Sequence, residues 1–145
     1  MENTWKQYLI INSSLNMSSG KLGAQASHAS LAFFMKKITE GIISENGDTI
    51  TCQFEVNKDL YDHWMNGIFT KVCLDGKNEK NMEKIVKKLE DNGFKENQDF
   101  FRIVDVGTTE FNGIPHWTAI GLAPMDSENE NLKKVMKRLQ VLKDR

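Results

Sequence analysis

Short apolar runs alternate along this chain with stretches whose apolar residues recur at helical spacing. Four runs are typical of buried strands, at residues 8–11, 70–74, 100–104 and 118–123. Helical spacing covers residues 20–40 and 78–92, and it returns from residue 127 or 129 onward. Helices that connect parallel strands cover both faces of a sheet, whereas strands that follow each other directly pair antiparallel. The pattern therefore predicts a three-layer α/β/α domain with a mixed, mostly parallel four-stranded sheet.

Length and composition fit a single domain. The 145 residues are 39% hydrophobic and 27% charged, so we assign residues 1–145 to one globular domain. No apolar run approaches the ~20 residues that span a bilayer, and residues 1–6 lack the layout of a secretory signal. Cys52 and Cys73 have strand-like neighbours and are interpreted as small buried thiols in a reducing compartment. We therefore expect a cytoplasmic protein.

The charge balance bears on nucleic-acid binding. The chain has 19 basic and 20 acidic residues, a formal net charge of −1, which argues against a strongly cationic nucleic-acid binder. Lysines nevertheless cluster on two of the expected helices, at residues 84–88 and 133–138. Each cluster is either a solvated helix face, the commoner arrangement, or part of a local basic surface.

Two polar segments stand where an α/β domain would bind a ligand. Residues 17–29 lead through Lys21 into the first expected helix, and residues 105–109 follow the strand at 100–104. Ligands of open sheets bind beyond the carboxyl ends of the strands, and a helix N-terminus favours an anion. Lys21 could stabilise an oxyanion, Asp105 could orient or deprotonate a water, and Thr109 could position it. Taken singly, Lys21 could instead be a solvent-facing lysine and Asp105 a loop cap.

These segments carry a resemblance to a known family, the type-2 peptidyl-tRNA hydrolases. The family's Met-x-x-Gly-Lys-x-x-Ala-Gln-x-x-His-Ala segment is matched by Met17, Gly20, Lys21, Ala24, Gln25, His28 and Ala29. Its Asp-Ala-Gly-x-Thr loop is matched by Asp105, Gly107 and Thr109. Further matches, in the family's order along nearly the whole chain, are Trp64, Gly67, Lys71, Val72, Thr118, Gly121 and Pro124.

The resemblance implies an enzyme that hydrolyses the ester between a peptide, or an N-blocked amino acid, and tRNA. It implies no metal ion and no cofactor, and the spacing of the three histidines offers no metal site. It implies catalytic roles for Lys21, Asp105 and Thr109. The residues expected to bind substrate are Gln25, His28, Lys71, Thr108 and Thr118. A helix histidine such as His28 more often satisfies a hydrogen bond in the core.

Relative to compact family members, residues 42–56 look like an insertion. This segment contains a turn at 45–48 and a strand-like stretch at 49–54. Its apolar and aromatic residues, if exposed, could support a homodimer.

The chain also departs from the family pattern. Asn12 and Ser14 replace a basic and an acidic residue, Thr108 replaces a common arginine, and Ser18-Ser19 stand where a lysine is frequent. Each change removes charge near the expected tRNA site. Two alternatives therefore stand beside hydrolysis of peptidyl-tRNA. One is a hydrolase of the same fold that acts on a smaller acyl ester or amide, and the other is a non-catalytic relative that binds RNA or protein.

Overall fold

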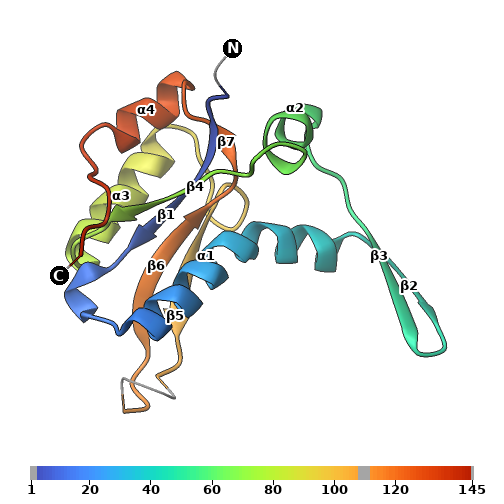
Figure 1. The fold of residues 1–145 in the computed structure, drawn as a ribbon, viewed down its shortest axis with the longest axis horizontal. Coiled ribbons are helices and arrows are strands. Elements are labelled where there is room, and N and C mark those ends of the chain that lie inside the picture. Colours follow the sequence, from blue (N-terminus) through green and yellow to red (C-terminus); the bar gives the residue numbers. More distant parts are fainter. Residues whose placement is uncertain (1–2, 108–111, 145) are drawn as a thin grey trace.

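A twisted sheet with helices on both faces forms the body of the molecule (Figure 1). The computed structural model describes residues 3–107 and 112–144. The sheet has the strand order β4-β1-β6-β5, and β7 also pairs with β1. Its strands are β1 (Trp5–Ile11), β4 (Lys71–Asp75), β5 (Phe100–Asp105), β6 (His116–Leu122) and β7 (Met125–Asp126). The remaining elements are η1 (Ser13–Leu15), α1 (Ser19–Glu40), β2 (Ile42–Asn46), β3 (Thr49–Gln53), α2 (Lys58–Leu60), η2 (Tyr61–Met65), α3 (Glu79–Asp91) and α4 (Glu130–Met136).

The sheet is mixed, as predicted, but the expectation that it is mostly parallel is wrong. Only β1 and β4 pair in parallel, whereas β6 pairs antiparallel with both β1 and β5, and β7 pairs antiparallel with β1. The antiparallel pairing of the last two predicted strands is confirmed. The error arose because β6 inserts between β1 and β5, so that one reversed strand makes both of its pairs antiparallel.

Helices cover both faces of the sheet, which confirms the three layers. Ile10 faces α3 and α4 in a core with Met82, Leu89, Phe100 and Leu132, while its neighbours Leu9 and Ile11 pack toward α1. This division follows from the alternation of side chains along a strand. The packing of α1 on β6 is close, because a Cβ on Gly121 would lie 2.0 Å from the carbonyl oxygen of Ala29.

The last helix is shorter than its sequence pattern suggests. The helical spacing that begins at residue 127 or 129 continues through Leu139 and Leu142 and predicts a helix to that point, but α4 ends at Met136. The chain then runs beside β4, where Asp75 N donates to Gln140 O and Leu142 N donates to Cys73 O. Leu139 and Leu142 still contact the core from this extended segment. Pairing with an open strand edge therefore replaces further helical hydrogen bonds.

A hairpin of β2 and β3 projects from the end of α1 (Figure 1). All of its strand residues are exposed, including Ile42 at 68% and Ile50 at 53%. The prediction that both cysteines are buried is wrong, because Cys52 on β3 is exposed and Cys73 is only partly buried. A two-stranded sheet has no second layer unless something packs on it, so neither of its faces is covered here. In the described part of the chain no helix is both long and apolar enough to cross a membrane.

Candidate active site

An ion pair between Lys21 and Asp105 lies at the end of the sheet where the last residues of β1 and β5 are found. Lys21 Nζ is 3.0 Å from Asp105 Oδ2, and the two side chains are only 9% and 10% exposed. Both positions follow from the fold, since Asp105 is the last residue of β5 and Lys21 stands in the first turn of α1. Ser18 caps this turn by accepting a hydrogen bond from Lys21 N. The convergence of Lys21 and Asp105 is therefore observed.

The surroundings of Asp105 favour its ionised form. The hydrogen bond from Lys21 is the main cause that lowers the pKa of Asp105 below its ordinary value, and desolvation opposes it. A further hydrogen bond from Gly107 N, at 3.0 Å to Oδ2, also lowers this pKa, as does the charge of His28. The site thus holds a carboxylate beside an ammonium group at neutral pH.

A buried amide and a buried hydroxyl support Asp105 from behind. Thr118 Oγ1 donates to Gln25 Oε1 at 2.6 Å, and Gln25 Nε2 lies 3.5 Å from Asp105 Oδ1. Gln25 follows Lys21 by one helical turn, so both side chains project from the same side of α1. Gln25 is 2% exposed and Thr118 is fully buried. Both carboxylate oxygens of Asp105 are therefore fixed by donors from α1 and its own loop.

Gly107 turns the chain sharply just after Asp105. Its φ is +83°, and a Cβ there would lie 2.4 Å from Ile114 O. Gly113 N donates to Gly107 O at 2.6 Å, so these two glycines lie side by side. This turn directs Gly107 N at the carboxylate. Val106 and Ile114, which flank the turn, are 64% and 58% exposed and give the site an apolar rim.

The other predicted site residues are not all brought together. His28 is exposed on α1, near enough for its charge to act on Asp105. Lys71 lies at the start of β4, at the opposite end of the sheet. Its Nζ is 4.2 Å from the ring centroid of Phe69 and donates to Phe69 O, and desolvation lowers the pKa of Lys71. Thr108 and Thr109 fall outside the described residues.

Asn12 is part of the support that sequence reasoning missed. It was noted only as a departure from the family pattern, yet it is 2% exposed. Its Nδ2 donates to Trp117 O at 2.9 Å, and its backbone N donates to Thr118 O. Asn12 thereby ties the end of β1 to the strand that carries Thr118. The available signal was a polar residue directly after a buried apolar run.

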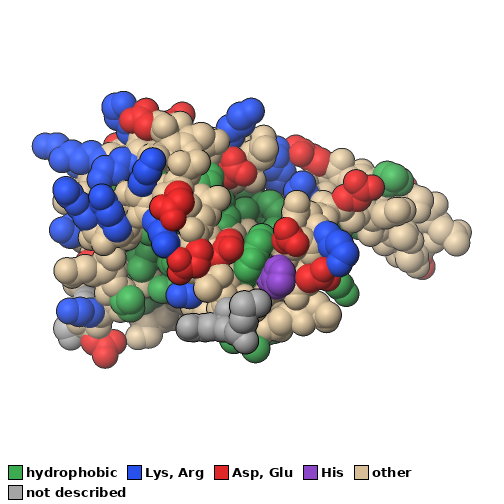
Figure 2. Space-filling view, turned by 90° about the horizontal axis from the view of Figure 1, so that it is seen from above, with side chains coloured by type: hydrophobic (Ala, Val, Ile, Leu, Met, Phe, Trp, Pro, Cys, Tyr) green, Lys and Arg blue, Asp and Glu red, His purple; other side chains and the backbone are tan. Residues whose placement is uncertain are grey.

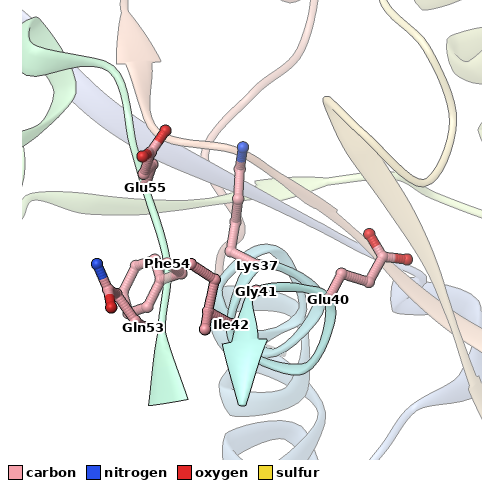
Figure 3. Close-up of a pocket in the computed structure, with 7 residues that line it drawn as sticks. All are labelled: Lys37, Glu40, Gly41, Ile42, Gln53, Phe54 and Glu55. Atoms are coloured by element: carbon pink, nitrogen blue, oxygen red, sulfur yellow. The ribbon is translucent and has the colours of Figure 1, made fainter. Parts of the chain in front are cut away.

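Hollows elsewhere on the surface are separate from this centre. One of about 400 Å³ lies at the base of the hairpin, between the end of α1 and β3, and includes Lys37 and Phe54 (Figure 3). Lys37 is sixteen residues along α1 from Lys21, or about 24 Å of helix. Among the described residues, no group of three or more His, Cys, Asp or Glu side chains is arranged to hold a metal ion.

Comparison with known proteins places these observations in a family context. A family model described as "Peptidyl-tRNA hydrolase PTH2" matches residues 5–142. The chain is also 30% identical over 140 residues to a protein named peptidyl-tRNA hydrolase from Methanococcus maripaludis strain C6, across 95% of this chain and 99% of that protein. A protein of the same name from strain S2 is 29% identical over the same coverage.

Proposed function

Because the chain belongs to the peptidyl-tRNA hydrolase PTH2 family, which its match over residues 5–142 shows, we propose that its Lys21–Asp105 centre carries out that hydrolysis. The bond cleaved is the ester between a peptide, or an N-blocked amino acid, and the terminal ribose of tRNA. The products are a free carboxylic acid and tRNA with a restored hydroxyl group. The observation that carries this assignment is the enclosed pair of Lys21 and Asp105, held at the end of the sheet where β1 and β5 finish.

Asp105 is proposed to orient the attacking water and to accept its proton. The water oxygen bonds to the ester carbonyl carbon, and a proton is later delivered to the ribose oxygen as the carbon–oxygen bond breaks. A carboxylate with a lowered pKa is a weak base, so its main contribution is to orient the water, with proton transfer late in the attack. Gly107 N and Gln25 Nε2 keep the carboxylate in place for this task.

Lys21 is proposed to stabilise the negative charge that develops on the carbonyl oxygen. An ammonium group has three N–H donors, and this one lies next to the carboxylate that would hold the water. A charge fixed in a largely enclosed position acts on the transition state without reorganising. Lys21 would thus contact the carbonyl oxygen, and Asp105 would contact the water that attacks the carbonyl carbon.

The remaining predicted residues receive narrower proposals. Thr109, four residues beyond Asp105, is proposed as the third catalytic group, with its hydroxyl positioning the water. Thr108 and His28 are proposed to contact the terminal nucleotide. The burial of Gln25 and Thr118 favours a positioning role, through Asp105, for both. Lys71 could contact only a remote part of the tRNA, given its place at the other end of the sheet.

The decisive experiment is release of free tRNA from an N-acetylaminoacyl-tRNA by the wild type and by Asp105→Ala. We expect turnover by the wild type and a loss of about 10²- to 10⁴-fold in the variant. Activity of the wild type on small acyl esters alone would favour the smaller-substrate alternative. Absence of turnover on every ester, at any salt concentration, would leave the non-catalytic alternative.

We further propose that the protein works in the cytoplasm, where translation supplies its substrate, and that it forms a homodimer through the hairpin. The register of the hairpin places Ile43, Ile50 and Cys52 on one face together with Glu45, and Ile43 and Ile50 are 47% and 53% exposed. Pairing with a second copy would cover the apolar side chains of this face. Light scattering should report a dimer for the wild type and a monomer for Ile43→Ser/Ile50→Ser. A monomeric wild type would refute this arrangement.

A further inference from the structure

A groove between α3 and the segment that follows α4 is lined by cations on both walls. It has a volume of about 290 Å³, and its basic lining residues are Lys77, Lys84, Lys88 and Arg138. Lys84 and Lys88 stand one turn apart on α3, about 6 Å along the helix axis, and Arg138 faces them from beyond α4. Figure 2 shows Lys and Arg side chains gathered on the side of the molecule that carries α3 and α4.

The positive charge of this groove is only partly offset by its own lining. Among the described residues, no salt bridge joins these four cations to a carboxylate, whereas Lys87 and Lys133 nearby are paired with Asp91 and Glu128. Of the described residues that line the groove only Asp75 is acidic, so four cations stand against one carboxylate. Its Oδ1 already accepts hydrogen bonds from Ser13 Oγ and Lys77 N. The groove is therefore basic although the chain as a whole has a net charge of −1.

The groove and the catalytic centre lie at the same end of the sheet. Asp75 ends β4 opposite Ile11 of β1, and β1 and β5 also finish at this end. The loop from β1 to α1 contacts the groove, since Ser13 Oγ bonds Asp75 and Ser14 N donates to Lys77 O. The order β4-β1-β6-β5 separates the ends of β4 and β5 by three strand spacings, roughly 14 Å. The groove lies on the face of the sheet that α3 and α4 cover, whereas Lys21 projects from α1 on the other face. The groove therefore does not contact the reacting ester, and the nucleotides that precede the ester would reach it around the end of the sheet.

We propose that this groove binds the sugar-phosphate backbone of the tRNA while its terminal ester occupies the Lys21–Asp105 centre. The inference rests on the proposed function, because the ester fixes one end of the RNA. Lysine and arginine side chains bind phosphates and release counterions. Gln140, also in the lining, adds a neutral side-chain amide suited to phosphate and ribose oxygens. Positive charge concentrated in one groove allows an acidic chain to bind a polyanion.

The test is charge reversal of the groove in Lys84→Glu/Lys88→Glu. The matched control is Lys37→Glu/Lys95→Glu. It makes the same change in net charge with exposed lysines near the end of α1 and the start of β5, at the other end of the strands. Kinetics with N-acetylaminoacyl-tRNA should show KM raised about tenfold or more in the groove variant, with kcat nearly unchanged. An N-acetylaminoacyl ester of adenosine alone should be hydrolysed equally by the wild type and both variants. Circular dichroism checks that α3 remains folded.

Direct binding of fluorescently labelled, deacylated tRNA separates this inference from the proposed function. A groove variant that loses affinity, with a slope of log K against log salt reduced by about 1–2, supports the groove even if the wild type hydrolyses nothing. Unchanged affinity and KM in the groove variant would overturn it while leaving hydrolysis intact. Equal losses in the groove and control variants would also overturn it, because only overall charge would then matter.

Discussion

Thr118 donates its hydroxyl proton to Gln25 at 2.6 Å in a fully enclosed position, and this bond decides which end of the Gln25 amide meets Asp105. Because Oε1 receives the hydroxyl, Nε2 is directed toward the carboxylate. A residue on β6 thus orients a residue on α1, which in turn supports the last residue of β5. The geometry of the carboxylate depends on three elements at once.

Removal of that hydroxyl should therefore disturb catalysis more than binding. In Thr118→Val the Gln25 amide loses its fixed orientation, and we expect kcat to fall about tenfold, or ~1.4 kcal/mol of transition-state stabilisation, with little change in KM. Steady-state hydrolysis of N-acetylaminoacyl-tRNA measures both constants. Thr118→Ser keeps the hydroxyl and should retain most of the activity. A fall in kcat of the same size for both variants would mean that packing, and not the hydrogen bond, is responsible.

The dependence of activity on pH should reveal the contact between Lys21 and Asp105. Since the pKa of Asp105 lies below its ordinary value of 3.8, the carboxylate is already ionised above that pH. We expect kcat/KM to show no loss from Asp105 protonation until the pH falls below about 4. Lys21→Met removes the largest cause of the lowered pKa, so the acid limb of its residual activity should move to higher pH. An unshifted limb in the variant would show that Lys21 does not govern this titration.

A double-mutant cycle of unfolding free energies should measure the interaction between Lys21 and Asp105. A depressed folded-state pKa contributes stability above the unfolded pKa, and this contribution is lost as the pH falls through the folded value. At pH 7, Asp105→Asn should lower the free energy of unfolding by about 1–3 kcal/mol, because it leaves an enclosed ammonium group without its carboxylate. Lys21→Met/Asp105→Asn should cost less than the sum of the two single changes. Urea unfolding at pH 7 measures all four proteins, and strict additivity would contradict a direct interaction.

Glycine substitutions should separate close packing from helix propensity. In Gly121→Ala the new Cβ would meet Ala29 O at 2.0 Å, so α1 must move away from β6. We expect the unfolding free energy to fall by about 1–3 kcal/mol and the activity to fall as Lys21 and Gln25 shift. Gly23→Ala, in the same helix with nothing within 4 Å of its Cβ, should be stabilising by up to about 1 kcal/mol. Thermal unfolding compares the two, and a harmless Gly121→Ala would mean that α1 tolerates displacement.

Local patterns predicted the elements well but not their long-range partners. The helix expected over 20–40 is α1, and the turn at 45–48 joins β2 to β3, because caps and turns depend on neighbouring residues. The position of β6 between β1 and β5 depends on residues about a hundred positions apart and leaves no local mark. For the same reason the extended path of residues 139–142 beside β4 was mistaken for helix.

The candidate site was predictable where it depends on residues at element ends. Lys21 begins a helix and Asp105 ends a strand, so the topology alone brought them to one edge. The role of Asn12 escaped prediction, because its partners are backbone carbonyls of a distant strand. Lys71 was grouped with the site by resemblance, but it is the first residue of β4 and lies at the other end of the sheet.

The projecting hairpin could be removed or lengthened without changing the rest of the fold. Ile42 and Gln53 face each other as the first pair of the β2–β3 ladder, so the backbone leaves the body and returns to it at almost the same point. Everything between them could be excised and the ends joined by a short link, without stretching the remaining chain or opening its core. The same point could accept a longer segment equally well. Insertions and deletions at this place would thus alter what the molecule associates with and leave the Lys21–Asp105 centre unchanged.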